Sequence, residues 1–171
     1  MNIGYAVVEK FYPQKDYKEI SGMNQIEEII SLDYLLCSSC IHTFNDEDAK
    51  YIFRSGDFCD FDIFNNLDYL LSKIDNFDGK QVLAVIKEPT QDCGHVSLNH
   101  FKFYGYDLLE DCSRRSVLTN CCGLYDPFFS KEVSKYGLIE DYHKAKIIQK
   151  WLIENEPSIH CCIWAIFRME K

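Results

Sequence analysis

The sequence predicts an α+β fold in which helices pack on a mostly antiparallel sheet. Four segments are expected to be strands, because their residues are apolar on both sides of an extended chain. The expected order places three helices after the first strand and another helix before the last one, as is typical of an α+β domain. The four strands are expected near residues 2–9, 81–87, 101–109 and 159–169.

The last of these segments is expected to lie inside the sheet. Ile163 and Phe167 point to one side of the extended chain, and Trp164 and Ile166 point to the other. A strand that is apolar on both sides needs cover on both, so an edge position would leave apolar surface in water.

Helices are indicated by capping patterns and by apolar residues that recur three and four positions apart. The first begins with a capping-box pattern from Asn24 to Glu27. The second begins with acidic residues that suit the positive end of the helix dipole. The third and fourth each carry one apolar stripe. The four helices are expected near residues 24–41, 46–55, 60–75 and 140–155.

Length and composition predict a single globular domain over residues 1–171. The chain is 47% hydrophobic and 15% aromatic, which is enough to form a core and argues against intrinsic disorder. It begins without a secretory signal pattern, and no stretch is apolar for as long as a membrane-spanning helix requires. Nine cysteines, an odd number, then favour reduced thiols and a cytoplasmic protein with no membrane partner.

The net charge of −9 argues against nonspecific nucleic-acid binding, because such a chain repels a polyphosphate. Much of the acidity lies in residues 44–78, where nine acids face three bases. Clustered carboxylates speed association with a basic protein, although a solvated face that keeps the protein soluble has the same composition. The expected partner-binding residues are Asp46, Glu47, Asp48, Asp57, Asp60, Asp62, Asp68 and Asp75, with Asp62, Asp68 and Asp75 on or near the solvent side of a helix.

In size, acidity and expected compartment, the chain resembles immunity proteins and antitoxins. This resemblance implies a non-enzymatic protein that neutralises a basic toxin or effector by binding it. The arrangement of the last 70 or so residues, which includes 118–123 and 135–139, also looks like one found in uncharacterised bacterial proteins. It implies a bacterial globular domain without an assigned activity.

An alternative hypothesis is a cysteine-dependent hydrolase or transferase. Cys121 or Cys122 would be the nucleophile, His160 the base, and Asp107 or Asn120 the residue that orients the base. The two thiols lie in a turn that ends at Gly123, but no family-specific signature surrounds them. The same residues are also compatible with a polar turn and packed thiols.

No metal or cofactor is expected. The CxxC pair of Cys37 and Cys40 falls near the end of a predicted helix, where the dipole does not stabilise a thiolate. A zinc-stabilised interaction module is a third reading, but the other cysteine pairs lack zinc-ligand spacing. The acids of residues 57–62 do not follow a calcium-loop pattern, and no glycine-rich phosphate loop is present.

Overall fold

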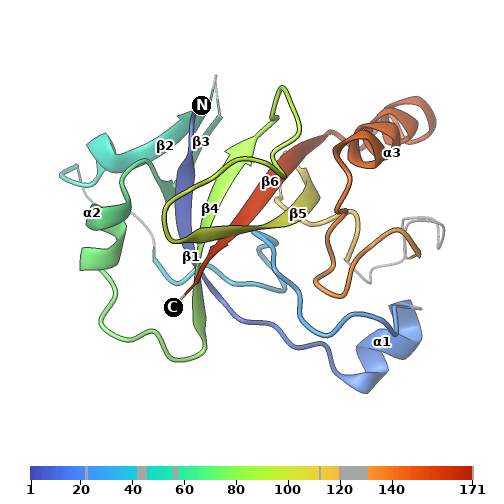
Figure 1. Ribbon diagram of the computed structural model, residues 1–171, viewed down its shortest axis with the longest axis horizontal. Helices are drawn as coiled ribbons and strands as arrows, with labels where there is room; N and C mark the ends of the chain where they lie inside the picture. Colours follow the sequence, from blue (N-terminus) through green and yellow to red (C-terminus); the bar gives the residue numbers. More distant parts are fainter. Residues whose placement is uncertain (22, 42–45, 56–57, 112, 120–130, 171) are drawn as a thin grey trace.

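The computed structural model describes residues 1–21, 23–41, 46–55, 58–111, 113–119 and 131–170 (Figure 1). Within this part of the chain, six antiparallel strands form one sheet, with the order β2-β3-β1-β4-β6-β5. The predicted α+β class is therefore confirmed. The strands are β1 (Gly4–Glu9), β2 (Ile52–Ser55), β3 (Phe58–Phe64), β4 (Lys80–Lys87), β5 (Phe101–Glu110) and β6 (Cys161–Met169), and the helices are α1 (Lys15–Ser21), the short 3-10 helix η1 (Ala49–Tyr51), α2 (Leu67–Ser72) and α3 (Tyr142–Asn155).

The four expected strands correspond to β1, β4, β5 and β6, and β6 lies between β4 and β5 as predicted. The helix expected at 140–155 is α3, which begins where the Asp141 carboxylate accepts a hydrogen bond from the Lys144 N–H at 2.9 Å. Its buried side chains are Ala145, Ile148 and Leu152, which are spaced to lie on one side of a helix. At 14 residues, α3 is the longest helix, and no helix in the described residues is long and apolar enough to cross a membrane.

Helices α2 and α3 cover two ends of the same sheet face. Cross-strand partners share a face, and Val7 pairs with Val82 beneath Leu70 of α2. Farther along this face, the ring of Tyr106 lies 5.4 Å from the ring of Tyr142 in α3. Figure 1 shows the two helices at opposite ends of the sheet.

The helix predicted at 24–41 does not form, and this prediction is wrong. The residues there follow an irregular path, and their backbone groups bond to other segments. The N–H groups of Glu27, Ile29 and Ile30 donate to carbonyl groups of Lys135, Phe11 and Tyr136. Since these donors are used by distant segments, they are not available for bonds within a helix. The apolar spacing that indicated a helix instead serves burial, because Ile29 and Ile30 are fully buried.

The helices predicted at 46–55 and 60–75 are largely replaced by strands. Residues 49–51 form the single turn η1, after which β2 and β3 pair with each other. Only 67–72 is helical in the second segment, where Asn66 caps α2 by accepting from the Tyr69 N–H at 2.8 Å. The apolar residues of 58–64 fit either period, and pairing with β1 selects the strand.

The sheet is curled, so strands that are not neighbours contact each other across it. Three strands separate β2 from β6, yet the ring of Phe53 in β2 lies 6.5 Å from the ring of Trp164 in β6. Both side chains are buried in the main core. The curl brings the β2–β3 hairpin over the sheet and determines which of the acidic residues reach water.

Candidate functional site

Four of the expected partner-binding acids are exposed, and they belong to two separate segments, 46–47 and 68–75. We call them the acidic face: Asp46, Glu47, Asp68 and Asp75. The two segments lie side by side because the ring of Tyr51 stacks on the ring of Tyr69 of α2, with the centroids 3.7 Å apart. An ion pair of 3.3 Å between Lys73 and Asp48 adds a second link.

The two stacked tyrosines give the acidic face an aromatic centre. Lys50 Nζ lies 4.9 Å from the centroid of the Tyr51 ring, and Lys73 Nζ lies 5.0 Å from that of Tyr69. These distances are within the range of cation–π attraction. Each of the two half-buried rings is thus already in contact with a cationic side chain of this chain.

Two of the expected partner-binding acids are buried in ion pairs. Asp62 is 3% exposed, and its carboxylate accepts two hydrogen bonds from Arg114, at 2.8 and 2.6 Å. Its predicted position on or near solvent is wrong, because β3 and the curl of the sheet turn it inward. Asp48 is also buried, beside Lys73. Asp57 lies outside the described residues, and for Asp60 only the backbone position in β3 is described.

The residues of the predicted cysteine site are only partly described. Cys121, Cys122 and Asn120 lie outside the described residues. His160 is exposed and precedes β6, where its carbonyl accepts from the Asp111 N–H at 2.8 Å. Asp107 is 1% exposed, and its carboxylate is bonded to groups other than His160. The structure thus does not bring Asp107 together with His160.

Asp107 belongs to a buried network of hydroxyl and carboxyl groups. Its carboxylate accepts from the hydroxyl groups of Ser31 and Ser116 and from the Leu108 N–H. Burial raises the pKa of Asp107 to about 7, although these hydrogen bonds act in the opposite direction. Asp33 lies beside it, fully buried, and accepts from the Ser116 N–H at 2.7 Å. The network joins β5 to the irregular segment 24–41, which contains Ser31 and Asp33.

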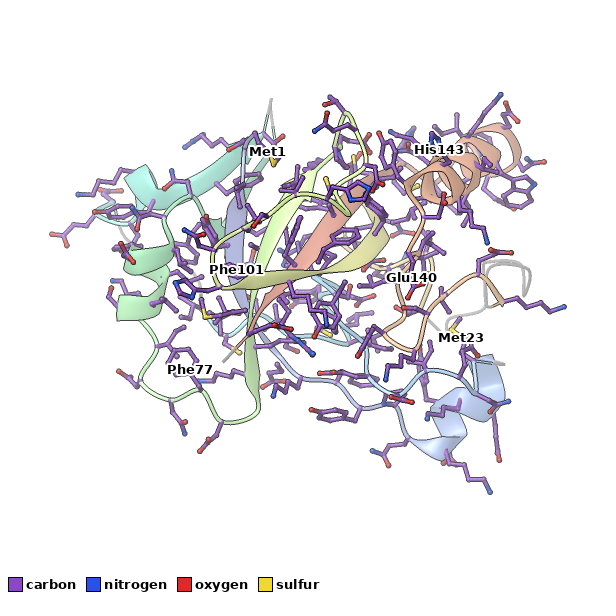
Figure 2. All side chains as sticks on the ribbon, in the orientation of Figure 1. Met1, Met23, Phe77, Phe101, Glu140 and His143 are labelled. Atoms are coloured by element: carbon purple, nitrogen blue, oxygen red, sulfur yellow. The ribbon has the colours of Figure 1, made fainter. Side chains whose placement is uncertain are left out.

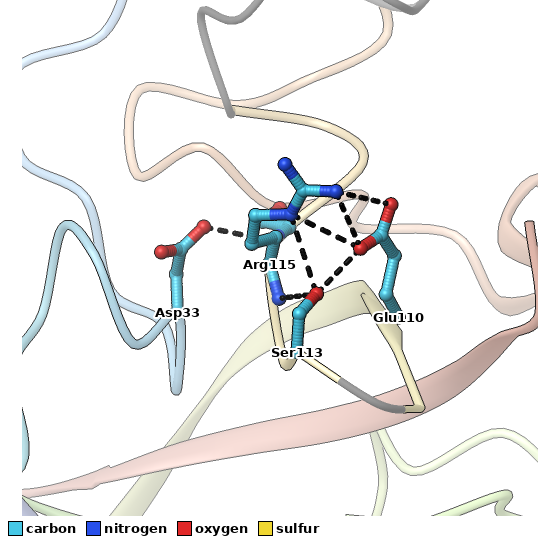
Figure 3. A network of polar contacts seen from close by, with 5 residues as sticks. Asp33, Glu110, Ser113 and Arg115 are labelled. Atoms are coloured by element: carbon cyan, nitrogen blue, oxygen red, sulfur yellow. Dashed lines mark hydrogen bonds and ion pairs between the residues drawn. The ribbon is translucent and has the colours of Figure 1, made fainter.

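The turn that follows β5 is held by a second set of polar contacts (Figure 3). Glu110 accepts from Arg115 Nε at 3.1 Å and from Arg115 Nη2 at 3.0 Å, and the Ser113 hydroxyl also donates to it. These bonds meet at Glu110 Oε2 and fix the path of the chain toward Ser116. They act in packing rather than in forming an open site.

The described thiols are poor nucleophiles. Burial raises the pKa of Cys161 and of Cys162 to about 12, and it also raises the pKa values of Cys37, Cys40 and Cys93. A thiol reacts as the thiolate, so these environments suppress reactivity. Within the described part of the chain, no group of three or more His, Cys, Asp and Glu side chains is arranged to hold a metal ion.

The sequence did not predict a groove of about 780 Å³ at the end of the sheet where the C-terminus lies (Figure 1). Its residues come from the start of β4, the end of β6, Tyr104 of β5 and loops, and only strand register brings them together. The available signal was polar residues within strands that are otherwise apolar, namely Gln81 and Arg168. The residues that line the groove include Lys10, Tyr12, Glu28, Phe77, Lys80, Gln81, Tyr104, Arg168 and Glu170.

No family model, curated protein or solved structure matches this chain at a significant level. What the acidic face and the groove can bind therefore follows only from the chemistry of their own side chains.

Proposed function

We propose that this chain is a cytoplasmic, non-enzymatic binding protein that neutralises a basic protein, in the manner of immunity proteins and antitoxins. One observation supports the proposal most strongly. Exposed carboxylates of residues 46–47 and of the α2 region belong to the same two segments as the stacked pair of Tyr51 and Tyr69. The need for solubility accounts for the carboxylates, but it does not account for a half-buried aromatic pair that joins the two acidic segments.

The two components of the acidic face have different roles in such an interface. Its carboxylates attract a cationic partner over a distance and speed the encounter. The tyrosines then supply contact area at a low cost in side-chain entropy, and their rings favour Arg or Lys side chains of the partner. The net charge of −9 adds to the attraction at low salt.

A charge-reversal variant tests this proposal. The partner is first identified by co-purification with the tagged chain from its source cells. Its association rate is then measured by stopped flow with D46K/E47K/D68K and with the matched control E19K/E140K/E154K, which reverses three exposed acids elsewhere. We expect the first variant to associate at least about tenfold more slowly than the control at low salt, with the difference shrinking as salt rises. Equal rates for the two variants would contradict the proposal.

The cysteine-dependent hydrolase or transferase remains the second candidate, with Cys121 or Cys122 as the nucleophile. One observation favours it: the His160 side chain is exposed and thus accessible to a substrate.

A further inference from the structure

The groove at the C-terminal end of β6 contains buried polar atoms that lack partners. Gln81 is 4% exposed, and neither its Nε2 nor its Oε1 has a hydrogen-bond partner in the described part of the chain. The same is true of Glu28 Oε1, while Glu28 Oε2 accepts from Arg168 Nη1 at 2.8 Å. A buried polar group without a partner costs about 1–3 kcal/mol, so three such atoms in one groove call for an explanation.

Tyr104 and Arg168, which line the groove beside these atoms, are held in position by each other and by Glu28. A shift in register between Phe103 and Gly105 makes a bulge in β5 at Tyr104. The Tyr104 hydroxyl accepts from Arg168 Nη2 at 2.6 Å, and its ring lies 4.3 Å from the Arg168 guanidinium carbon. Bulges often redirect a side chain next to a functional site. Here the bulge holds Arg168 between Glu28 and Tyr104.

The charge of the groove differs from that of the protein as a whole. Glu28 is paired with Arg168, and Glu170 lies 3.8 Å from Lys102. Lys10 and Lys80 also line the groove, and neither forms an ion pair with a described residue. In a chain with a net charge of −9, the two lysines make the groove locally suited to an anionic group.

Exposed aromatic rings complete the groove. Tyr12 is 55% exposed, and Phe77 is 47% exposed. Phe77 lies in the loop that precedes β4 (labelled in Figure 2). Rings in such positions favour a ligand with a flat face, because stacking removes apolar area from water on both sides.

We propose that this groove binds adenine, as a nucleoside or as a nucleotide. The Gln81 amide carries a donor and an acceptor side by side, which match the N7 acceptor and the amino group of adenine. Glu28 Oε1 accepts a further N–H of the base, Tyr12 or Phe77 stacks on its face, and Lys10 and Lys80 face a phosphate group when one is present. The purine thus supplies the partners that the buried atoms lack.

The test uses the full chain and isothermal titration calorimetry with adenosine, AMP, GMP and inorganic phosphate. The variant Q81M keeps the size of the side chain and removes its amide, and Q91M is the matched control at an exposed position outside the groove. We expect adenosine to bind, AMP to bind more tightly because Lys10 and Lys80 contact its phosphate, and GMP to bind more weakly than AMP because guanine has an acceptor in place of the amino group of adenine. We expect Q81M to weaken adenosine binding by about 5- to 150-fold, as the loss of a bidentate base contact would. The control should bind as the unaltered chain does.

Thermal unfolding without ligand shows whether the Q81M variant folds. We expect its Tm to equal or exceed that of the unaltered chain, because replacing an unpartnered buried amide by an apolar group removes a cost. A lower affinity in a folded Q81M protein supports the proposal. Binding of inorganic phosphate alone, equal adenosine affinity in Q81M and Q91M, or no purine binding at millimolar concentration would each overturn it.

Discussion

At the scale of single residues, Asp107 is expected to control how stability depends on pH. Its pKa in the folded chain is about 7, above the value of about 3.9 expected when the chain is unfolded. Between these two values the folded chain binds more protons at this group than the unfolded chain does. The contribution of Asp107 is therefore fully present below about pH 4, and it is lost as the pH rises toward 7.

The variant D107N tests this expectation, because Asn keeps the shape of the side chain and cannot ionise. Urea midpoints of the two proteins are compared from about pH 4 to about pH 7. We expect the unaltered chain to lose stability relative to D107N across this interval, by up to a few kcal/mol. The control D75N, at an exposed position, should follow the unaltered chain. Parallel curves for D107N and the unaltered chain would mean that Asp107 does not titrate in this range.

Residue-level burial was the hardest property to predict from sequence. Asp62 lies among acids that read as a solvated surface, and its partner Arg114 is 52 positions away. Nothing in the local pattern of either residue distinguishes a buried ion pair from two exposed charges, since the pairing depends on how the sheet curls. By contrast, the exposure of three other acids does not depend on the curl of the sheet. Asp46, Glu47 and Asp68 lie in short segments at the surface.

At the scale of elements, strands were predicted better than helices. The segments that became β1, β4 and β6 are apolar on both sides, a local property that suits the middle of a sheet. The segments at 24–41 and 60–75 carry apolar residues at spacings that fit a helix. Their actual conformations are set by backbone bonds to distant segments, as between Ile29 and Phe11. Such bonds cannot be read from a window of local sequence.

The bulge in β5 is expected to require glycine at position 105. Gly105 has a φ of +142°, and a Cβ at this position would lie 2.8 Å from the Ile139 carbonyl oxygen. We expect G105A to lower the free energy of unfolding by more than the ~1–3 kcal/mol typical of backbone strain alone. The matched control is G79A, since Gly79 has a φ of +68° and no atom within 4 Å of the added Cβ. Urea unfolding of the two variants measures the difference, and equal losses would show that the contact with Ile139 has no cost.

At the scale of the whole molecule, the sequence predicted the fold class but not the groove. Composition and charge are sums over the chain, so conclusions drawn from them do not depend on the correct assignment of each helix and strand. The groove depends on register, because Gln81 pairs with Val8 while Arg168 pairs with Leu83 on the neighbouring strand. A shift of one residue in either ladder would turn these side chains to the opposite face.

The labelling pattern of all nine cysteines separates the two proposed functions. Iodoacetamide attacks the thiolate, and the raised pKa values of Cys161, Cys162 and the other described thiols predict labelling far slower in the native chain than in urea. Mass spectrometry after a short pulse at neutral pH reads each site. A binding protein needs no activated thiol, so we expect no site to label faster in the native chain than in urea. Faster native labelling of Cys121 or Cys122, abolished by H160Q, would instead favour the cysteine-dependent enzyme.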